Sequence, residues 1–235
     1  MIWWAIVCII ILGCAGALAY ACIIPSSQVF APVVNRGPAA SRSVVLTFDD
    51  GPAPPFTERV LDILGEHRIS ATFFLCGKNV ERHPEIARRI VREGHTIGNH
   101  TYSHPFLFAR SRMFIAAEID RAQETIERVT GVRPTLFRPP YGARWFGLMP
   151  VLRQRGLKMV MWSVAGCDWK YKTQAIISAT TRRMRPGTVI LLHDGHEHPP
   201  AGGIDQSSTV EALPAIIKAV SQAGLTFAPI EKIIP

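Results

Sequence analysis

Charged side chains are absent from the first 35 residues of this 235-residue chain. Residues 1–24, MIWWAIVCIIILGCAGALAYACII, form an apolar run that is long enough to cross a bilayer as one helix. Such a run does not suit the solvated surface of a folded domain. We therefore expect a transmembrane anchor or a signal segment here.

The positively charged start of a secretory signal is also missing, apart from the amino terminus itself. We favour an uncleaved anchor, with a single N-terminal span in the cell membrane and the rest of the chain on its extracytoplasmic side. Ala17-Leu18-Ala19 and Ala19-Tyr20-Ala21 match small-x-small cleavage sites, so secretion after signal cleavage is the alternative. A lipid-modified Cys14 is disfavoured because the apolar run continues beyond it.

Cysteine is scarce outside this segment. Of five cysteines, three fall within residues 1–24, and only Cys76 and Cys167 remain in the body of the chain. This number excludes a disulfide scaffold, and no CxxC pair is present to hold a metal. The two thiols form either a single bridge or a pair of core side chains.

Internal repeats and low-complexity tracts are also missing. With 48% hydrophobic and 19% charged residues, the chain suffices for one domain with a sizeable core. We place a linker at residues 25–42 and the folded domain at residues 43–235.

The net charge of +8 suits an anionic partner such as a nucleic acid, an anionic lipid or an anionic cell-wall polymer. The aromatic-basic interleaving typical of nucleic-acid binding is absent, so we expect no nucleic acid.

What the body contains is an alternation of short apolar runs with amphipathic helical patterns. The expected strands are SVVLTF, ATFFLC, HTIGN, PTLF, KMVMWSV, TVILL and LTFAPI. Alternation of this kind predicts a parallel sheet. Seven or so repeats fit either a reduced (β/α) barrel or an open doubly wound sheet.

Two of the helical patterns have clear ends. One has apolar residues spaced by four, three, four and three from Ile115 to Val129, and Gly131 follows as a stop signal. The other extends from Val210 to Val220, with the capping pattern Ser208-x-x-Glu211 before it and Gly224 after it.

Unusual polar residues follow five of the expected strands. They are Asp49 and Asp50 after VVLTF, His100 and His104 after HTIGN, Arg138 after PTLF, Asp168 after VMWSV, and His193 after TVILL. Parallel sheets and barrels gather their active sites at the carboxyl ends of their strands. The five stretches therefore predict one site.

His100 and His104 are spaced so that both rings can face one point. With one carboxylate of the Asp49-Asp50 pair they form a set of two histidines and one aspartate. This set suits a catalytic Zn²⁺ with open positions for water and substrate, and it also serves non-haem Fe(II). The other carboxylate is then free to act as a base.

The remaining polar residues have roles that follow from their chemistry. Arg138 can keep a carboxylate ionised and oriented, and Tyr141 offers a backbone N–H after two prolines that have none. Asp168 can orient and charge His193 as a general acid. We interpret His196 and His198 as exposed loop histidines.

In order, TFDDGP, HTYSH, RPPYG, DW and LLHD resemble the five motifs of the NodB-type polysaccharide deacetylases, carbohydrate esterase family 4. The resemblance covers residues 43–230. It implies a distorted (β/α) barrel, usually seven-stranded and here preceded by the N-terminal apolar helix. It also implies one divalent metal, commonly zinc.

The resemblance assigns roles around the metal. Asp49 matches the catalytic base, and Asp50, His100 and His104 match the metal ligands. Arg138 matches the arginine that orients the base.

It also assigns the rest of the pocket. Tyr141 matches the residue whose backbone binds the oxyanion, His193 the acid and Asp168 its partner. Trp169 and Leu191 match the apolar walls around the acetyl methyl group. The sequence departs from the family at Ala165, where many members have an acidic residue at the start of the fourth motif.

The implied function is hydrolysis of N-acetyl groups on a GlcNAc-containing polysaccharide, either peptidoglycan or a chitin-like oligosaccharide. Two alternatives stay open. One is a deformylase or amidase that acts on a small or lipid-linked sugar, and the other is a non-catalytic carbohydrate-binding relative. The complete set of metal and acid-base residues argues against the second.

Overall fold

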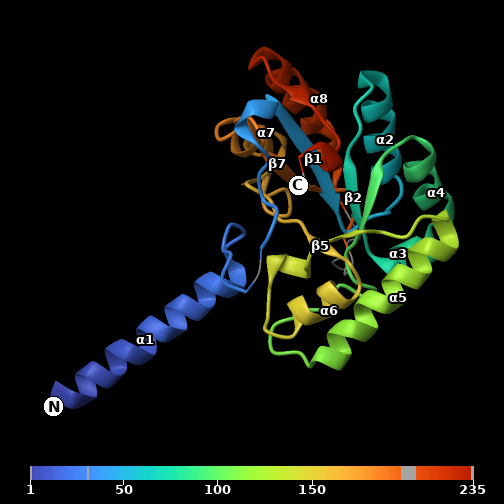
Figure 1. Ribbon diagram of the computed structural model, residues 1–235. Helices are drawn as coiled ribbons and strands as arrows, with labels where there is room; N and C mark the ends of the chain where they lie inside the picture. The colour runs from blue at the N-terminus through green and yellow to red at the C-terminus, as the bar shows by residue number, and fades with distance from the viewer. Residues whose placement is uncertain (1, 31, 197–204, 234–235) are drawn as a thin grey trace.

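The protein is described by a computed structural model in which residues 2–30, 32–196 and 205–233 are placed. One parallel sheet forms its centre (Figure 1). The strands are β1 (Ser43–Asp49), β2 (Thr72–Leu75), β3 (Thr96–Asn99), β4 (Leu136–Phe137), β5 (Lys158–Met159), β6 (Val164–Ala165), β7 (Val189–His193) and β8 (Thr226–Phe227). Seven of them follow the order β5-β4-β3-β2-β1-β7-β6, and β8 pairs with the start of β1. The expected seven-stranded distorted barrel is confirmed.

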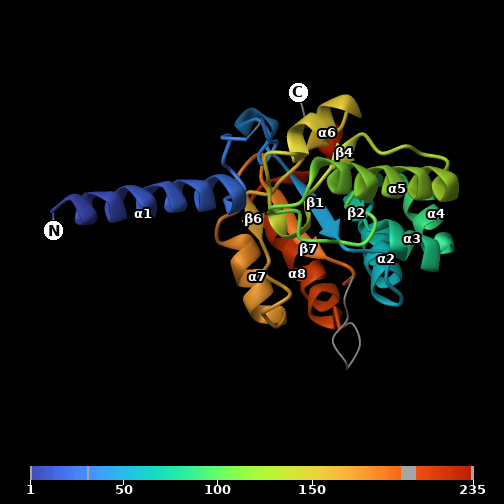
Figure 2. The ribbon, with the colours of Figure 1, turned by 90° about the horizontal axis from the view of Figure 1, so that it is seen from below.

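The helices lie outside the curled sheet (Figures 1 and 2). They are α1 (Ile2–Ile23), α2 (Phe56–His67), α3 (Gly77–Arg82), α4 (Pro84–Arg92), α5 (Arg112–Thr130), α6 (Leu148–Gln154), α7 (Thr173–Thr181) and α8 (Ser207–Gln222). Three short 3₁₀ turns complete the described elements: η1 (Ala39–Ser41), η2 (Pro140–Gly142) and η3 (Ile230–Lys232).

Side chains of the central strand β1 alternate between two environments. Val44, Leu46 and Phe48 pack into the large apolar cluster that the strands share with α2, α4, α5, α7 and α8. Val45 belongs to a second cluster, formed by side chains on the opposite face of the strands. Because successive side chains point to opposite faces, Asp49 lies on the same face as Val45. The strand therefore delivers Asp49 to the interior of the barrel at its carboxyl end.

The two best-defined helix predictions are largely confirmed. α5 begins after Ser111, whose hydroxyl accepts from the Phe114 N–H, and ends at Gly131 with φ +74°. α8 closes before Gly224 as expected, but its cap prediction is wrong. The helix starts at Ser207, so Ser208 lies inside it, and the Glu211 carboxylate accepts from the Thr173 hydroxyl instead.

The expected strand over residues 158–164 is divided into β5 and β6. Between them, the carbonyls of Val160 and Met161 accept from the buried guanidinium of Arg138 at 3.1 and 3.2 Å. These carbonyls are therefore not available to a neighbouring strand. The two ends of the sheet, β5 and β6, do not pair with each other in the part of the chain that the structure describes.

A segment before β1 lies beside this gap. Val34 forms a bridge with Val160, next to β5, and Arg36 forms one with Thr188, next to β7. Part of the expected linker thus contributes to the wall of the barrel. The division of the chain into residues 1–24, 25–42 and 43–235 stays a prediction.

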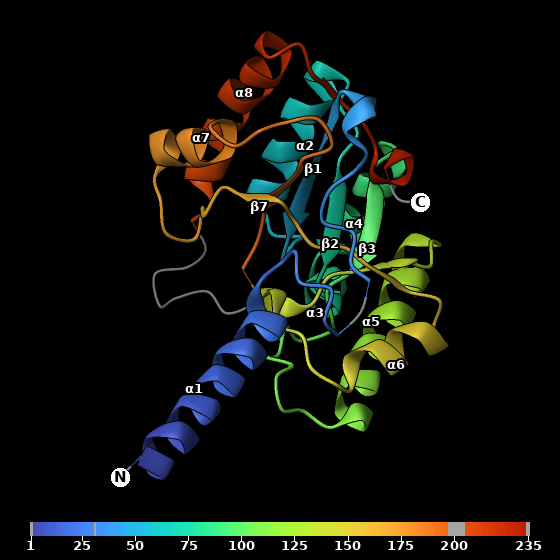
Figure 3. The same ribbon diagram turned by 60° about the vertical axis from the view of Figure 1, so that its left-hand side comes forward.

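α1 projects away from the body (Figures 2 and 3). Its window Ile6–Ile23 has a mean hydropathy of 2.6 and is 11% buried, so the helix is long and apolar enough to cross a membrane. A signal sequence has the same properties. The uncleaved anchor and the cleaved signal segment both stay predictions.

Candidate active site

The carboxyl ends of the strands surround a pocket of 330 Å³. Eight of the predicted site residues line it: Asp49, Asp50, His100, His104, Tyr141, Trp169, Leu191 and His193. Arg138 and Asp168 stand behind this lining and contact it through Asp49 and His193. All ten residues predicted from the sequence are thus brought together.

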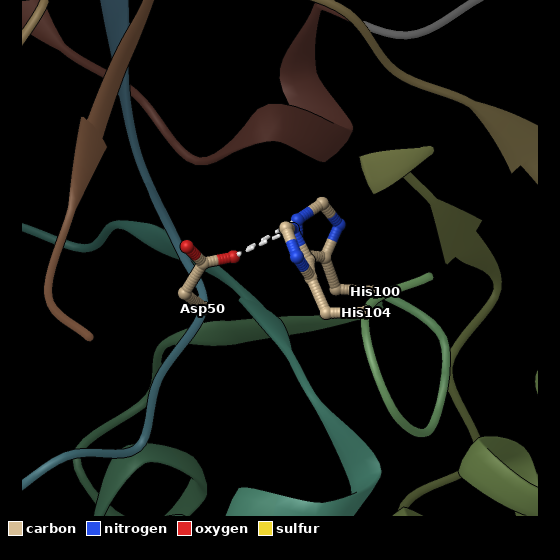
Figure 4. A group of neighbouring side chains, drawn as sticks. All are labelled: Asp50, His100 and His104. Carbon is tan, nitrogen blue, oxygen red and sulfur yellow. Dashed lines mark ion pairs between the residues drawn. The ribbon is translucent and has the colours of Figure 1, made fainter. Parts of the chain in front are cut away.

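Asp50, His100 and His104 form the most tightly clustered group (Figure 4). The Asp50 Oδ1 atom lies 3.2 Å from Nε2 of His100 and 3.1 Å from Nε2 of His104. All three side chains are buried. Asp50 has φ +75° and His104 has φ +54°, so the chain adopts left-handed conformations that are uncommon for residues other than glycine. Such positions are typical of functional sites.

The hydrogen bonds of His100 indicate that a cation belongs in this group. Its Nδ1 lies 2.7 Å from the carbonyl oxygen of Arg138, which can only accept, so Nδ1 carries the proton. In the neutral ring, Nε2 then directs a lone pair at Asp50. Oδ1 of Asp50 is buried and has no hydrogen-bond partner. Two acceptors that face each other without a proton between them suit a shared metal ion.

The distances also fit a metal. Ligand atoms bound about 2.0–2.2 Å from a tetrahedral ion lie roughly 3.4 Å apart, close to the 3.2 and 3.1 Å that separate Asp50 from the two histidines. All three ligand atoms lie within 4.8 Å of one another. Without a metal ion, a proton on either imidazole takes its place: burial alone would raise the pKa of Asp50, but hydrogen bonds from His100 and His104 hold it well below its usual range. The carboxylate is therefore ionised and can act as a ligand. This group of one aspartate and two histidines could hold a divalent ion.

The neighbouring carboxylate of Asp49 has different partners. Its Oδ1 accepts from Nη1 of Arg138 at 2.6 Å, and its Oδ2 lies 3.8 Å from Nε2 of His100. The guanidinium of Arg138 is fully buried and also donates to the Thr47 hydroxyl at 2.8 Å. It lies 4.1 Å from the centre of the Phe74 ring. Arg138 is thereby held in one position, and with it the orientation of Asp49.

His193 stands on another side of the pocket and is held by Asp168. Nδ1 of His193 lies 2.8 Å from one carboxylate oxygen of Asp168, and the His193 backbone N–H donates to the other at 2.7 Å. Burial alone would lower the pKa of His193, but Asp168, with smaller contributions from Asp50 and Asp49, raises it to about 10. The ring therefore carries a proton at neutral pH.

The Tyr141 turn forms another wall of the pocket. Tyr141 has φ +58°, and its ring centre is 4.7 Å from that of His104. Gly142 follows with φ +65°, and a Cβ atom there would lie 2.6 Å from Cη2 of Trp162. Only glycine fits this close approach. Trp162 itself was not predicted, because nothing in its local sequence distinguishes it from a strand residue.

Trp169 and Leu191 complete the apolar part of the lining. The Trp169 ring stands edge-on to His193 with 5.3 Å between centres, and Trp169 is 56% exposed at the mouth of the pocket. Leu191 is almost fully buried. His196 also lines the pocket and is half-buried, which corrects the expectation of an exposed loop histidine. His198 lies outside the described residues.

Sequence reasoning missed two further polar residues at the site. Thr209, in α8, donates to the same oxygen of Asp168 that accepts from the His193 backbone, at 2.8 Å. Asp194 is fully buried and accepts from the Thr57 hydroxyl at 2.6 Å. Burial, together with Asp50 and Asp49, raises its pKa to about 7. Asp194 follows a strand like the other site residues, whereas no local signal identifies Thr209.

The two body cysteines do not contribute to this chemistry. Cys76 is buried, Cys167 is half-buried, and neither forms a disulfide within the part of the chain that the structure describes. Ala165, the departure from the family pattern, lies in β6 opposite Leu191 and is not part of the pocket lining.

Comparisons with known proteins agree with this geometry. A family model described as polysaccharide deacetylase matches residues 36–160. The chain is 40% identical over 192 residues to a peptidoglycan-N-acetylglucosamine deacetylase of Bacillus cereus, covering 81% of this chain and 68% of the relative. It is 39% identical over 198 residues to a chitooligosaccharide deacetylase of Sinorhizobium fredii, covering 81% of this chain and 91% of the relative.

A solved structure gives the same result. The crystal structure of a peptidoglycan N-acetylglucosamine deacetylase in complex with 4-naphthalen-1-yl-N-oxidanyl-benzamide superimposes with a TM-score of 0.80 and 36% sequence identity. The superposition covers 86% of this chain and 92% of that chain.

Proposed function

The chain belongs to the polysaccharide deacetylase family, carbohydrate esterase family 4, and we propose that it removes N-acetyl groups from a GlcNAc-containing polysaccharide. The observation that carries this proposal is that the neighbouring carboxylates of Asp49 and Asp50 have different partners. Asp50 turns to two histidines, Asp49 turns to Arg138, and a protonated His193 lines the same pocket. Metal-assisted hydrolysis of an amide uses all three groups: a cation, a base and an acid.

Asp50, His100 and His104 would hold the ion, and Zn²⁺ is the ion that we propose for this set of ligands. A divalent metal bound there supplies Lewis-acid chemistry, which polarises the acetyl carbonyl and makes a water molecule more acidic.

Asp49 is the proposed general base. Its carboxylate lines the same pocket as the proposed metal ligands, and the Arg138 contact fixes the orientation in which it can accept a proton. As the attacking water adds to the amide carbon, its proton passes to Asp49. The backbone N–H of Tyr141 is the proposed donor to the oxygen on which negative charge develops.

His193 is the proposed general acid. It gives its proton to the amide nitrogen as the C–N bond breaks, so that the sugar leaves as a neutral amine and the acyl group as acetate. Asp168 keeps the imidazolium charged until that step. Trp169 and Leu191 would surround the methyl group of the acetyl.

The polymer is proposed from the relatives. Those described above are named for peptidoglycan N-acetylglucosamine and for chitooligosaccharides. Peptidoglycan fits best with the net charge of +8, since the cell wall is anionic. We also propose that α1 is an uncleaved membrane anchor and that the body of the chain lies on the extracytoplasmic side.

A panel of substrates tests this function. The full chain, loaded with zinc, is incubated with peptidoglycan, with chitooligosaccharides of increasing length and with an N-formylated sugar, and the released acid is identified. We expect acetate from the first two and little formate from the third. Formate alone would show a deformylase, and a zinc-loaded protein that binds the glycans but releases no acid would show a carbohydrate-binding relative.

A further inference from the structure

An apolar surface near the pocket is exposed in a way that the deacetylase site does not explain. Its members, referred to below as the apolar surface, are Phe106, Phe108, Met113, Phe114 and Phe146. Met113 is 82% exposed and Phe146 is 64% exposed. Contiguous exposed patches of large apolar residues mark interaction sites more often than single exposed residues do.

Aromatic rings connect this surface to the pocket at one end and to the base of α1 at the other. Seven rings follow one another across this region, in the order His104, Tyr141, Phe106, Phe108, Trp145, Phe146 and Phe30. The centres of neighbouring rings are 4.4 to 6.0 Å apart. The metal ligand His104 and the segment just after α1 are therefore the two ends of one aromatic chain.

The base of α1 is fixed to the same part of the body. The Arg144 backbone N–H donates to the Cys22 carbonyl at 3.0 Å, and its guanidinium donates to the Ser27 carbonyl at 2.8 Å. The guanidinium also donates to the Ile24 carbonyl. Figures 1 and 3 both show the loop before α5 on the side of the body from which α1 leaves. A membrane that contains α1 would thus lie next to the apolar surface.

The charges around the apolar surface suit lipid headgroups. Arg110 and Arg112 are exposed at the start of α5, and the Arg110 guanidinium lies 5.1 Å from the centre of the Phe114 ring. Within the described ranges, neither arginine forms an ion pair with an acidic residue. Surfaces that combine aromatic and basic side chains are typical of proteins that lie in the interface of an anionic bilayer.

We propose that the apolar surface rests in the headgroup region of the membrane that α1 enters. This inference rests on the proposed membrane span. It places the mouth of the catalytic pocket beside the bilayer, so the enzyme would act preferentially on GlcNAc-containing glycans that are held at the membrane surface. The observations favour the bilayer over a stacking platform for soluble glycans, because the aromatic chain ends at Phe30, beside the base of α1 that Arg144 holds to the body.

Lipid contact can be measured directly on the full chain in nanodiscs. A fluorescent amino acid is incorporated at position 113, at position 12 in the middle of α1, or at the exposed position 66 on α2. Lipids with nitroxide groups near the headgroup and, in parallel, lipids with nitroxide groups deep in the acyl chains serve as quenchers, because position 12 would lie near the bilayer centre. We expect quenching at positions 12 and 113 and none at position 66. Quenching at position 12 without quenching at position 113 would overturn the inference and leave the span intact. Absence of quenching at both positions would overturn both. The measurement requires no catalysis, so it is independent of the deacetylase proposal.

A charge at the same position tests the consequence for activity. Met113→Glu puts an acid in the first turn of α5, where it suits the helix dipole, so the variant should fold. We expect about a fivefold loss of activity on a GlcNAc oligosaccharide anchored in anionic vesicles, with activity on soluble chitooligosaccharides unchanged. Met113→Leu, the matched control, should keep both activities. Equal losses on the two substrates would indicate a glycan platform, and no loss on either would remove the membrane role.

Discussion

Asp49 and Asp50 are neighbours in the chain, yet their carboxylates meet different partners. One accepts from a buried guanidinium, and the other approaches two imidazole nitrogens. The left-handed conformation of Asp50 allows this division, since it turns the second side chain away from the regular alternation of the strand. Adjacency therefore places the proposed metal ligand and the proposed proton acceptor in one pocket.

Replacement of Asp49 should separate metal binding from turnover. We expect Asp49→Asn to retain its metal and to lose activity by about 10²- to 10⁴-fold, because the amide cannot accept the proton of the attacking water. Acetate release and metal content are measured on the same sample. Asp50→Asn is the matched control and should lose the metal.

The Asp49 variant also leaves the buried Arg138 without its carboxylate, which destabilises the fold. Circular dichroism must therefore show that the variant is folded at the assay temperature. A folded, metal-loaded Asp49→Asn protein with wild-type turnover would refute the assignment of the base.

The pH profile should report the Asp168-His193 pair. A general acid is active only when it is protonated, so activity falls as the pH rises through the pKa of His193. Asp168 contributes strongly to raising this pKa to about 10, far above the usual value. We expect Asp168→Asn to shift the alkaline limb of kcat/KM to lower pH. An alkaline limb that does not move would mean that another group supplies the proton.

At the scale of the elements, hydrophobic patterns predicted the strands and the longest helices, because burial produces those patterns directly. Prediction failed where a distant side chain decides the local hydrogen bonds. The run from residue 158 to residue 164 is apolar throughout, but Arg138 occupies the carbonyls at its centre. The local sequence of this run cannot reveal a contact with a residue more than twenty positions away.

The catalytic role of the Tyr141 turn can be tested with one substitution inside the turn and a matched control substitution elsewhere. Gly142→Ala places a Cβ at φ +65° and 2.6 Å from Trp162, whereas Gly131→Ala at φ +74° meets nothing within 4 Å. The left-handed backbone alone should lower the stability of both variants by about 1–2 kcal/mol, which is a few degrees in Tm for a domain of this size. Gly142→Ala should lose more than Gly131→Ala, because its Cβ also meets Trp162. Only Gly142→Ala should also lower kcat, because it displaces a wall of the pocket. Equal kcat values for the two variants would show that the turn has no catalytic role.

At the scale of the whole molecule, the site is assembled from ends of strands that are far apart in sequence. This convergence could be predicted, since parallel strands gather their carboxyl ends on one face. The residues that support the pocket from behind could not be predicted. Thr209 comes from α8, and Val34 reaches the barrel wall from the segment before β1, and neither position has a sequence signal. Long-range packing alone places them.

The most direct test of the central claim is a metal titration of the metal-free protein with acetate release as the readout. Zn²⁺ is added in steps to the full chain and, in parallel, to His104→Ala, with a chitooligosaccharide as substrate. We expect activity to rise until one equivalent of metal is bound, and we expect the variant to gain almost none. Acetate release by the metal-free protein, or equal activation of the variant, would contradict this claim.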